Sequence, residues 1–222
     1  SRNNLSIKDW KFDTVVAVPL LKNSWPLILS ALFISIYLKI DQVMIKVMID
    51  SESVGQYAAA VTLSEAWYFL PMIINISIFP AIINSRKDPI IYRKRIQRLY
   101  NLMFFLAVLI AIPMTFYSEW IINLLLGSDY IVAADVLKIH IWAGIFVFLG
   151  VSSTRWLLAE NLQIYSMFNT AIGALINVCL NYFLIKEYGI VGAAWSTLIS
   201  YMFAGYICFL FFKKTRVNFL SL

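Results

Sequence analysis

Charged residues are scarce in this chain of 222 residues: Asp, Glu, Lys and Arg make up 14% of it, whereas hydrophobic residues make up 61%. Soluble domains average about 25% charged and about 45–50% apolar residues. A compact soluble domain cannot bury such an excess of apolar side chains. The composition therefore excludes a disordered chain and an ordinary soluble enzyme. Together with a mean hydropathy of +0.79, it predicts an integral membrane protein.

Cysteine and catalytic motifs are equally sparse. The two cysteines, Cys179 and Cys208, both lie inside apolar runs, which excludes a disulfide framework and a cysteine zinc site. No segment carries a GKS/T phosphate loop, an HExxH helix or a GxSxG elbow. We therefore expect no cofactor, no metal site and no enzyme activity, and we exclude an ATP-driven pump within this chain.

The apolar residues gather in runs long enough to cross a bilayer, which requires about 17–25 residues. The runs are continuous, whereas β-barrel strands alternate over about ten residues. We predict an all-α integral membrane fold with a cytoplasmic linker over residues 1–25 and a six-helix lobe over residues 26–222. The predicted transmembrane helices are 27–49, 57–83, 101–117, 138–158, 164–185 and 190–212.

The positions of Lys and Arg predict the orientation of these helices. Fourteen of the eighteen basic residues lie in the N-terminal tail, the second and fourth links and the C-terminal tail, all on one side. The loops at 50–54 and 118–134 have no Lys or Arg, and the fifth link has only Lys186. Both termini of this segment are expected to face the cytoplasm. The net charge of +6 is therefore explained by topology, and we expect no nucleic-acid partner.

Two segments are amphipathic and are not predicted to span. Residues 88–100 are predicted to form a basic helix lying on the membrane surface, with Ile90, Ile91, Ile96 and Leu99 as apolar contacts. Residues 120–127 are predicted to form a short interfacial piece on the opposite side.

The first predicted helix contains charges, which are costly in lipid and need a partner or a wet cavity. At about 100° per residue, Ser35, Lys39, Gln42 and Lys46 form a polar stripe on one face, while Asp41 lies on another. Counted from the outer helix ends, Glu65 lies at a depth similar to that of Asp41 and close to that of Lys39. Either Lys39 and Glu65 form a structural ion pair, or these charges line an aqueous cavity.

The fifth predicted helix carries a second polar stripe, which includes Asn169, Asn177 and Asn181. Small and amide residues at this spacing mediate close helix packing in membranes, and lining of the same cavity is the alternative. Arg155 either reaches toward the headgroups or meets a phosphate entering from the cytoplasmic leaflet. His140 stands alone, so a metal site there is not expected.

Several strings resemble a known family. SWPLILS leading into IYLKIDQVMI, VGQYAAAVTLSEAWYFLPMII followed by FPAII, and LLLGSDYIVAADVLKI resemble the second half of Wzx-type O-antigen repeat-unit flippases. The string NVCLNYFLIKEYGIVGAAWSTLISY is similar to the last helix hairpin of the multidrug/oligosaccharidyl-lipid/polysaccharide exporter superfamily. The resemblance extends from Trp10 to Phe212.

The resemblance implies a MATE-like transporter of two six-helix lobes around a central cavity, of which this chain would be the C-terminal lobe. Because the chain begins at Ser1 and not at Met, we expect a missing N-terminal lobe to precede it. The implied activity is movement of undecaprenyl-pyrophosphate-linked oligosaccharides across the bacterial cytoplasmic (inner) membrane by alternating access. A complex with the O-antigen polymerase and chain-length regulator is also implied.

Family members are expected to use cationic cavity residues and ion coupling, which can be assigned to residues of this chain. The candidate substrate-binding residues are Lys39, Lys46, Gln42, Arg155 and Asn177, and the candidate ion-coupling residues are Asp41 and Glu65. Two alternatives stay open. A cation-coupled exporter of small molecules would need an acidic or aromatic cavity, and a membrane-embedded glycan polymerase would need a larger outer loop.

Overall fold

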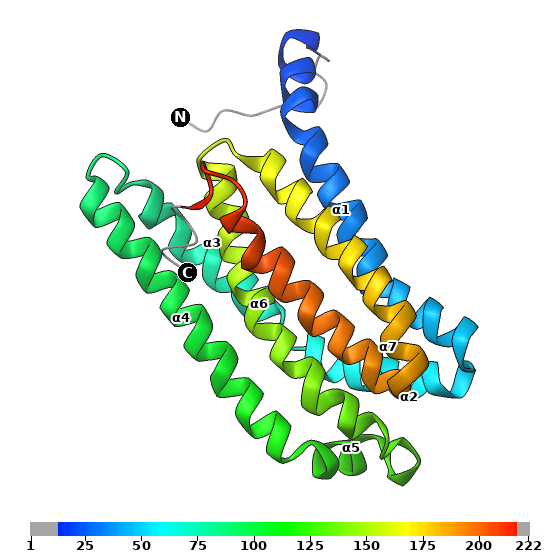
Figure 1. The fold of residues 1–222 in the computed structure, drawn as a ribbon. Coiled ribbons are helices and arrows are strands. Elements are labelled where there is room, and N and C mark those ends of the chain that lie inside the picture. Colours follow the sequence, from blue (N-terminus) through cyan, green and yellow to red (C-terminus); the bar gives the residue numbers. More distant parts are fainter. Residues whose placement is uncertain (1–12, 217–222) are drawn as a thin grey trace, which may run out of the picture.

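The computed structural model describes residues 13–216, and this part of the chain contains helices but no strand (Figure 1). The elements in chain order are α1 (Thr14–Met48), α2 (Ser51–Glu65), α3 (Phe69–Ile83), α4 (Pro89–Phe116), α5 (Ser118–Leu126), the 3₁₀ turn η2 (Ser128–Tyr130), α6 (Ala133–Ala159), α7 (Gln163–Gly205) and the 3₁₀ turn η3 (Ile207–Leu210).

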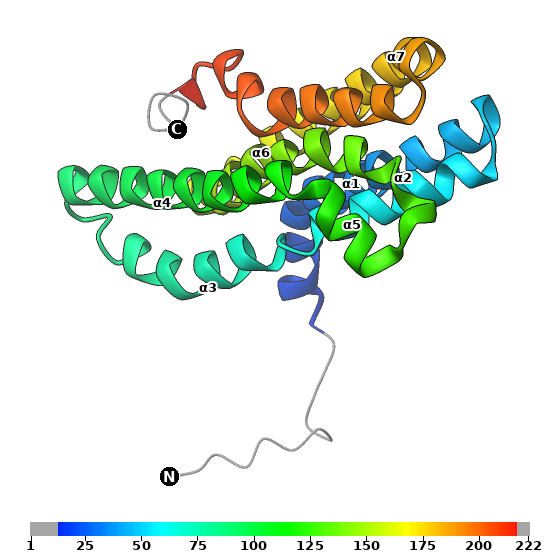
Figure 2. The same cartoon turned by 90° about the horizontal axis from the view of Figure 1, so that it is seen from below.

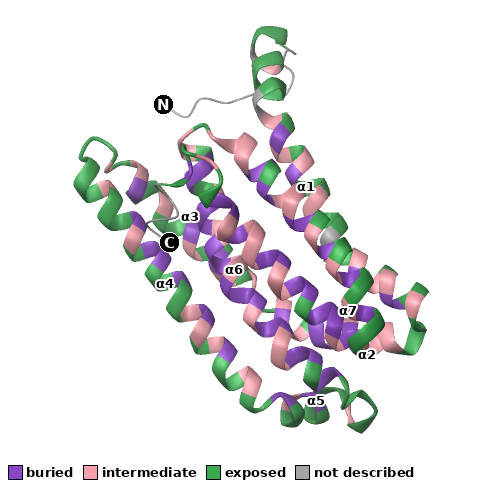
Figure 3. Ribbon diagram, viewed as in Figure 1, coloured by how far each residue is buried: buried purple, intermediate pink, exposed green. Residues whose placement is uncertain are grey.

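Helix α6 is the centre of the lobe. It packs against α2, α3, α4, α5 and α7, whereas α1 packs mainly against α7. The residues of α6 that are apolar or small occur on all sides of this helix, and a helix of this kind is stable only when its neighbours bury it. Figure 3 accordingly shows the buried residues concentrated on α6 and α7, while α4 and the upper part of α1 are largely exposed. In a membrane protein this outer surface faces lipid or another part of the assembly.

Five helical segments of the described chain are long and apolar enough to cross a membrane. They are Ser24–Met48, Ser51–Ile83, Pro89–Phe116, Ala133–Ala159 and Gln163–Leu210. This confirms the predicted class, an all-α multi-pass membrane protein. The last segment is 48 residues long, far more than one crossing needs, because it bends back on itself. The count of six spans stays a prediction.

The bend in α7 lies at Gly189, whose φ of 59° is in the left-handed region that favours glycine. Two antiparallel arms result, as predicted for 164–185 and 190–212 (Figure 1). A side chain at Gly173 on the first arm would meet Ala204 on the second at 2.7 Å, so the arms pack closely. The second arm ends at Gly205 and not at 212. There the backbone passes so close to α6 that a Cβ would lie 2.5 Å from the Phe146 carbonyl oxygen.

The span predicted over 57–83 lies within the candidate span Ser51–Ile83, but a short turn interrupts its helix. Helix α2 begins at Ser51 and ends at Glu65, and α3 begins at Phe69 after a short turn. The cause is Pro71, which has no N–H to donate to the carbonyl four residues earlier. That carbonyl, on Trp67, instead accepts a hydrogen bond from the Leu70 N–H at 3.1 Å.

The prediction of a separate surface helix over 88–100 is wrong. These residues are the first turns of α4, which continues without a break to Phe116 (Figure 2). Asp88 caps the helix by accepting hydrogen bonds from the Ile90 and Ile91 N–H groups at 3.0 and 3.1 Å, and Pro89 occupies the first turn, where its missing N–H is not needed. A cluster of charges changes which environment a helix prefers but does not interrupt its backbone hydrogen bonds.

Other helix boundaries in the structure differ from the predicted ones by a few residues or by more than one helical turn. Helix α1 begins at Thr14 and is capped by Asp13, so residues 14–25 of the predicted linker are helical. Residues 1–12 lie outside the described residues. Helix α6 begins at Ala133, before the predicted 138. The short segment predicted at 120–127 forms most of helix α5, and its position at the membrane interface stays a prediction.

Candidate functional site

A buried carboxylate lies near the C-terminal third of α1. Asp41 is only 3% exposed. Its Oδ2 accepts hydrogen bonds from the Tyr57 hydroxyl at 2.7 Å and from Thr197 Oγ1 at 2.6 Å, and its Oδ1 accepts one from Asn181 Nδ2 at 2.5 Å. Asn181 Nδ2 also donates to Asn177 Oδ1 at 3.2 Å. We call these five residues the Asp41 cluster.

The cluster joins the consecutive helices α1 and α2 to α7, which is distant from both in sequence. Tyr57 lies near the second turn of α2, and this helix is fixed at its start by Asp50, whose side chain accepts a hydrogen bond from the Ser53 N–H at 2.7 Å. The same backbone N–H lowers the pKa of Asp50, so the cap stays ionised at neutral pH. Tyr57 is thereby held against α1 at the level of Asp41.

The two arms of α7 supply the remaining members. Asn177 and Asn181 are one turn apart and therefore share a face of the first arm. Thr197 lies on the second arm, which can approach because Gly192 has no side chain where the Leu184 backbone passes. The glycine bend thus places an amide and a hydroxyl on either side of one carboxylate.

No cation neutralises this carboxylate. Among the described residues, no Lys or Arg nitrogen lies within 4.0 Å of Asp41. The ion pairs are Arg86–Glu160, Lys138–Glu119 and Lys138–Asp135, all near helix ends. A carboxylate buried without a counter-charge is strongly unfavourable, and it becomes neutral by taking up a proton or by binding a cation. In the structure, the hydrogen bonds from Tyr57, Asn181 and Thr197 are what stabilises this carboxylate.

The cluster also has unused hydrogen-bonding capacity. Asn181 Oδ1 and Asn177 Nδ2 are buried and have no hydrogen-bond partner, whereas buried polar atoms are nearly always satisfied. The oxygens of Asp41, Tyr57 and Thr197 lie within hydrogen-bonding distance of one another, and Asn181 presents its Nδ2 to them.

A histidine lies beside the cluster. His140 on α6 is 1% exposed, its Nδ1 lies 3.0 Å from Ser64 Oγ, and its ring meets the Tyr57 ring edge-on with centroids 6.3 Å apart. A cavity of about 10 Å³ adjoins Ser64 and the α2–α3 turn, which is about the volume that one water molecule needs. The described residues contain no group of three or more His, Cys, Asp or Glu side chains that could hold a metal.

The other predicted residues lie outside the cluster. Lys39, Lys46 and Arg155 are exposed, and Gln42 and Glu65 are half-buried. Lys39 and Glu65 do not form an ion pair within 4.0 Å, so of the two alternatives the structure lacks the ion pair. Asn177 is fully buried.

Sequence reasoning missed Tyr57 and Thr197 as functional candidates. Both are about 1% exposed, and both donate to the carboxylate. Thr197 stands in a run of small residues, GAAWST, which signals close helix packing. That run indicated that the last arm touches its neighbours, but not which neighbour it touches.

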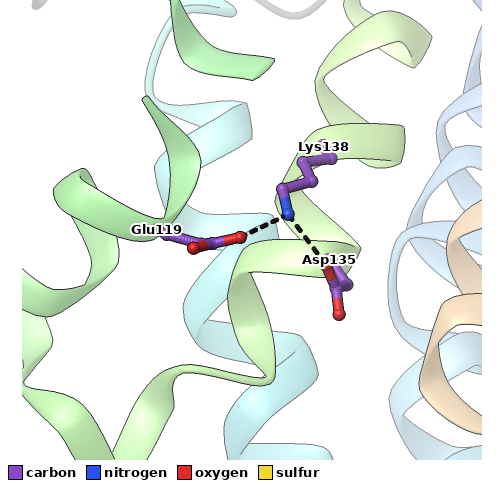
Figure 4. A network of polar contacts seen from close by, with 3 residues as sticks. All are labelled: Glu119, Asp135 and Lys138. Atoms are coloured by element: carbon purple, nitrogen blue, oxygen red, sulfur yellow. Dashed lines mark hydrogen bonds and ion pairs between the residues drawn. The ribbon is translucent and has the colours of Figure 1, made fainter. Parts of the chain in front are cut away.

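The start of α6 carries a surface network of charged side chains (Figure 4). Lys138 Nζ binds Glu119 Oε1 at 2.8 Å and Asp135 Oδ1 at 3.0 Å. Glu119 lies on α5, so the network fixes this short helix against the start of α6. Both carboxylates are exposed, and the arrangement is that of a structural ion pair.

The fold and the buried polar cluster define a multi-pass helical membrane protein. The family described as "Polysaccharide biosynthesis protein" matches residues 5–135, and the chain belongs to this family. The chain is also 27% identical over 170 residues to the "Probable low-salt glycan biosynthesis flippase Agl15" of Haloferax volcanii. That alignment covers 74% of this chain and 35% of the relative, so the chain spans about a third of the relative's length.

No solved structure matches the chain. The family match and the relative confirm the predicted Wzx-type flippase-like family.

Proposed function

We propose that this chain is the C-terminal lobe of a flippase that moves undecaprenyl-pyrophosphate-linked O-antigen or polysaccharide repeat units across the bacterial cytoplasmic membrane. The lobe works by alternating access together with an N-terminal lobe, and both ends of this segment face the cytoplasm. Transport is driven by a cation or proton that binds at Asp41. The observation that carries the coupling proposal is the burial of Asp41 among neutral donors with no positive charge within 4.0 Å in the described chain.

The arrangement of the Asp41 cluster supports a coupling role because it joins three helices. A cation that enters the cluster draws in Asp41, Tyr57 and Thr197 and removes the buried negative charge. Rotating the Asn181 amide by 180° would present its unpartnered oxygen to the cation, in exchange for the hydrogen bonds that Nδ2 donates to Asp41 and Asn177. Loading and unloading therefore change how strongly α1 and α2 are held to the arms of α7. We assign Asn177 to this site and not to the substrate surface.

The exposed face of α1 is the proposed substrate surface. Lys39 and Lys46 are seven residues apart, about two turns, so they lie on one face of α1 with Gln42 between them. Both lysines are exposed, and ammonium groups attract pyrophosphate as point charges. Arg155 on α6 extends the positive charge toward the cytoplasmic leaflet.

Complementation tests the proposal in cells. A flippase-deficient strain receives the full-length gene as wild type, Asp41→Asn or Lys39→Ala with Lys46→Ala. We expect surface glycan to be lost in both variants at unchanged protein levels. Glu119→Gln is the matched control, because it removes an exposed carboxylate outside the cluster, and it should complement fully. Normal surface glycan with Asp41→Asn would refute the coupling role.

Cation binding is tested on the purified protein. Raising NaCl at constant ionic strength, with choline chloride as the replacement salt, should raise the melting temperature of the wild type and leave Asp41→Asn unchanged. If sodium has no effect while alkaline pH destabilises only the wild type, the coupling ion is the proton. Equal responses of wild type and Asp41→Asn to both would exclude Asp41 as the binding site.

The fate of the lipid-linked repeat units separates a flippase from a polymerase. Loss of a flippase leaves the units on the cytoplasmic leaflet. Loss of a polymerase leaves single units exposed on the periplasmic side. Labelling with a membrane-impermeant reagent distinguishes the two outcomes, and periplasmic accumulation would refute the proposal.

A further inference from the structure

The start of α4 carries a concentration of positive charge that the proposed transport does not use. Residues 86–98 contain six Lys or Arg residues and one carboxylate, Asp88. The Asp88 side chain is occupied by the N–H groups that it caps. Two of the six cations also have partners: Arg86 pairs with Glu160 at 2.8 Å, and Arg95 donates to the Ala81 carbonyl at 2.5 Å.

The remaining cations of α4 itself share one exposed side of the helix with two isoleucines. At 100° per residue, this side covers an arc of about 160°. It consists of Ile90, Ile91, Arg93, Lys94 and Arg98, all exposed, and we call it the basic face. Ile90 is 80% exposed. Among the described residues, no carboxylate lies within 4.0 Å of its three cations.

The length of α4 places the basic face at the level of the lipid headgroups. Residues 99–116 carry no charge and span about 27 Å at 1.5 Å per residue, close to the hydrocarbon thickness of about 30 Å. Residues 89–98 add about 15 Å, which extends through the headgroup layer. Because α4 is one continuous helix, its basic turns stand upright in that layer instead of lying flat on it.

A surface that combines cations with exposed isoleucines is suited to anionic phospholipids. The cations meet phosphodiesters, and the isoleucines, which are costly to leave in water, meet the first methylenes of acyl chains. A soluble polyanion would satisfy the cations but leave the isoleucines in water. We propose that the basic face is a binding site for anionic phospholipid headgroups, with phosphatidylglycerol as the probe. This site is separate from the Asp41 cluster, and its existence does not depend on the proposed transport.

The test measures the first bound lipid by native mass spectrometry of the full chain in detergent. Arg93→Gln with Lys94→Gln removes two charges of the basic face, while Lys213→Gln with Lys214→Gln removes two exposed charges elsewhere. Since each basic residue near an anionic surface contributes about fivefold in affinity, the first double variant should bind phosphatidylglycerol about 25-fold more weakly. The second should stay within about twofold of wild type. Phosphatidylcholine binding should be the same in all three proteins.

Three outcomes would overturn the proposal. The first is phosphatidylglycerol affinity in the Arg93/Lys94 variant within twofold of wild type at an unchanged melting temperature. The second is an equal loss in the Lys213/Lys214 control, which would show a response to net charge alone. The third is displacement of phosphatidylglycerol by equimolar inorganic pyrophosphate, which would show that the cations bind a soluble phosphate and not a lipid.

Discussion

Replacing Thr197 by valine removes a hydroxyl from the Asp41 cluster with little change in volume. The Thr197 hydroxyl donates to Asp41 Oδ2 at 2.6 Å and is fully buried. This hydroxyl also lies 3.2 Å from the Tyr57 hydroxyl and 3.1 Å from the Ala193 carbonyl oxygen. A hydrogen bond to a charged acceptor contributes about 1.5–3 kcal/mol in soluble proteins, whereas hydrogen bonds inside membranes average about 0.6 kcal/mol and reach about 1.7. Tyr57 still donates to the same oxygen at 2.7 Å, so this carboxylate oxygen keeps a hydrogen-bond donor. We therefore expect Thr197→Val to lower the free energy of unfolding by about 1–1.5 kcal/mol.

The assay is thermal unfolding in detergent, where about 1 kcal/mol corresponds to about 2–4 °C in a chain of this size. Thr197→Val should melt about 3–5 °C below the wild type. Thr170→Val is the matched control, because its hydroxyl donates only to carbonyls of its own helix, and it should shift melting by less than about 2 °C. In an Asp41→Asn background the effect of Thr197→Val should fall below about 0.5 kcal/mol. Equal losses for Thr197→Val and Thr170→Val would refute the reasoning.

Two further substitutions test the packing of the lobe. Gly192→Ala should destabilise the protein by at least about 1–3 kcal/mol, because the new Cβ collides with the Leu184 backbone. Gly55→Ala is the control and should be neutral or stabilising, since a Cβ there has nothing within 4 Å. Comparable melting temperatures for the two variants would contradict the hairpin packing. Glu160→Gln should lower the free energy of unfolding by about 0.5–1 kcal/mol, since the ion pair of Glu160 with Arg86 is partly exposed. Salt at 1 M should remove most of the difference in melting temperature between variant and wild type. A difference that persists in salt would show that the contact is not electrostatic.

The class of the protein could be predicted from composition because the requirement for apolar length in a bilayer acts on each helix separately. Asp41 could be singled out for the same reason: a charge inside an apolar run is costly whatever its neighbours are. Asn177 and Asn181 were also placed on one face correctly, because an i, i+4 spacing fixes that face locally.

The partners of Asp41 could not be predicted, because they depend on the depth and rotation of three helices at once. Tyr57 and Thr197 are 16 and 156 residues away from it in sequence. A depth count along straight helices paired Lys39 with Glu65, but α2 ends at Glu65 and the chain turns there. The basic start of α4 was misassigned because its charge pattern describes the environment of a helix and not its continuity.

The sequence separation inside the Asp41 cluster has a consequence for how the protein is made. Asn181 and Thr197 follow Asp41 by 140 and 156 residues. At about 5–20 residues per second, the ribosome needs roughly 7–30 s to deliver them. During this interval α1 must be accommodated in or beside the membrane with a carboxylate that has at most Tyr57 as its partner within the cluster. The firm docking of the first helix of this segment therefore waits for the last, and a nascent chain that stops before Gly189 keeps its N-terminal helix only loosely assembled.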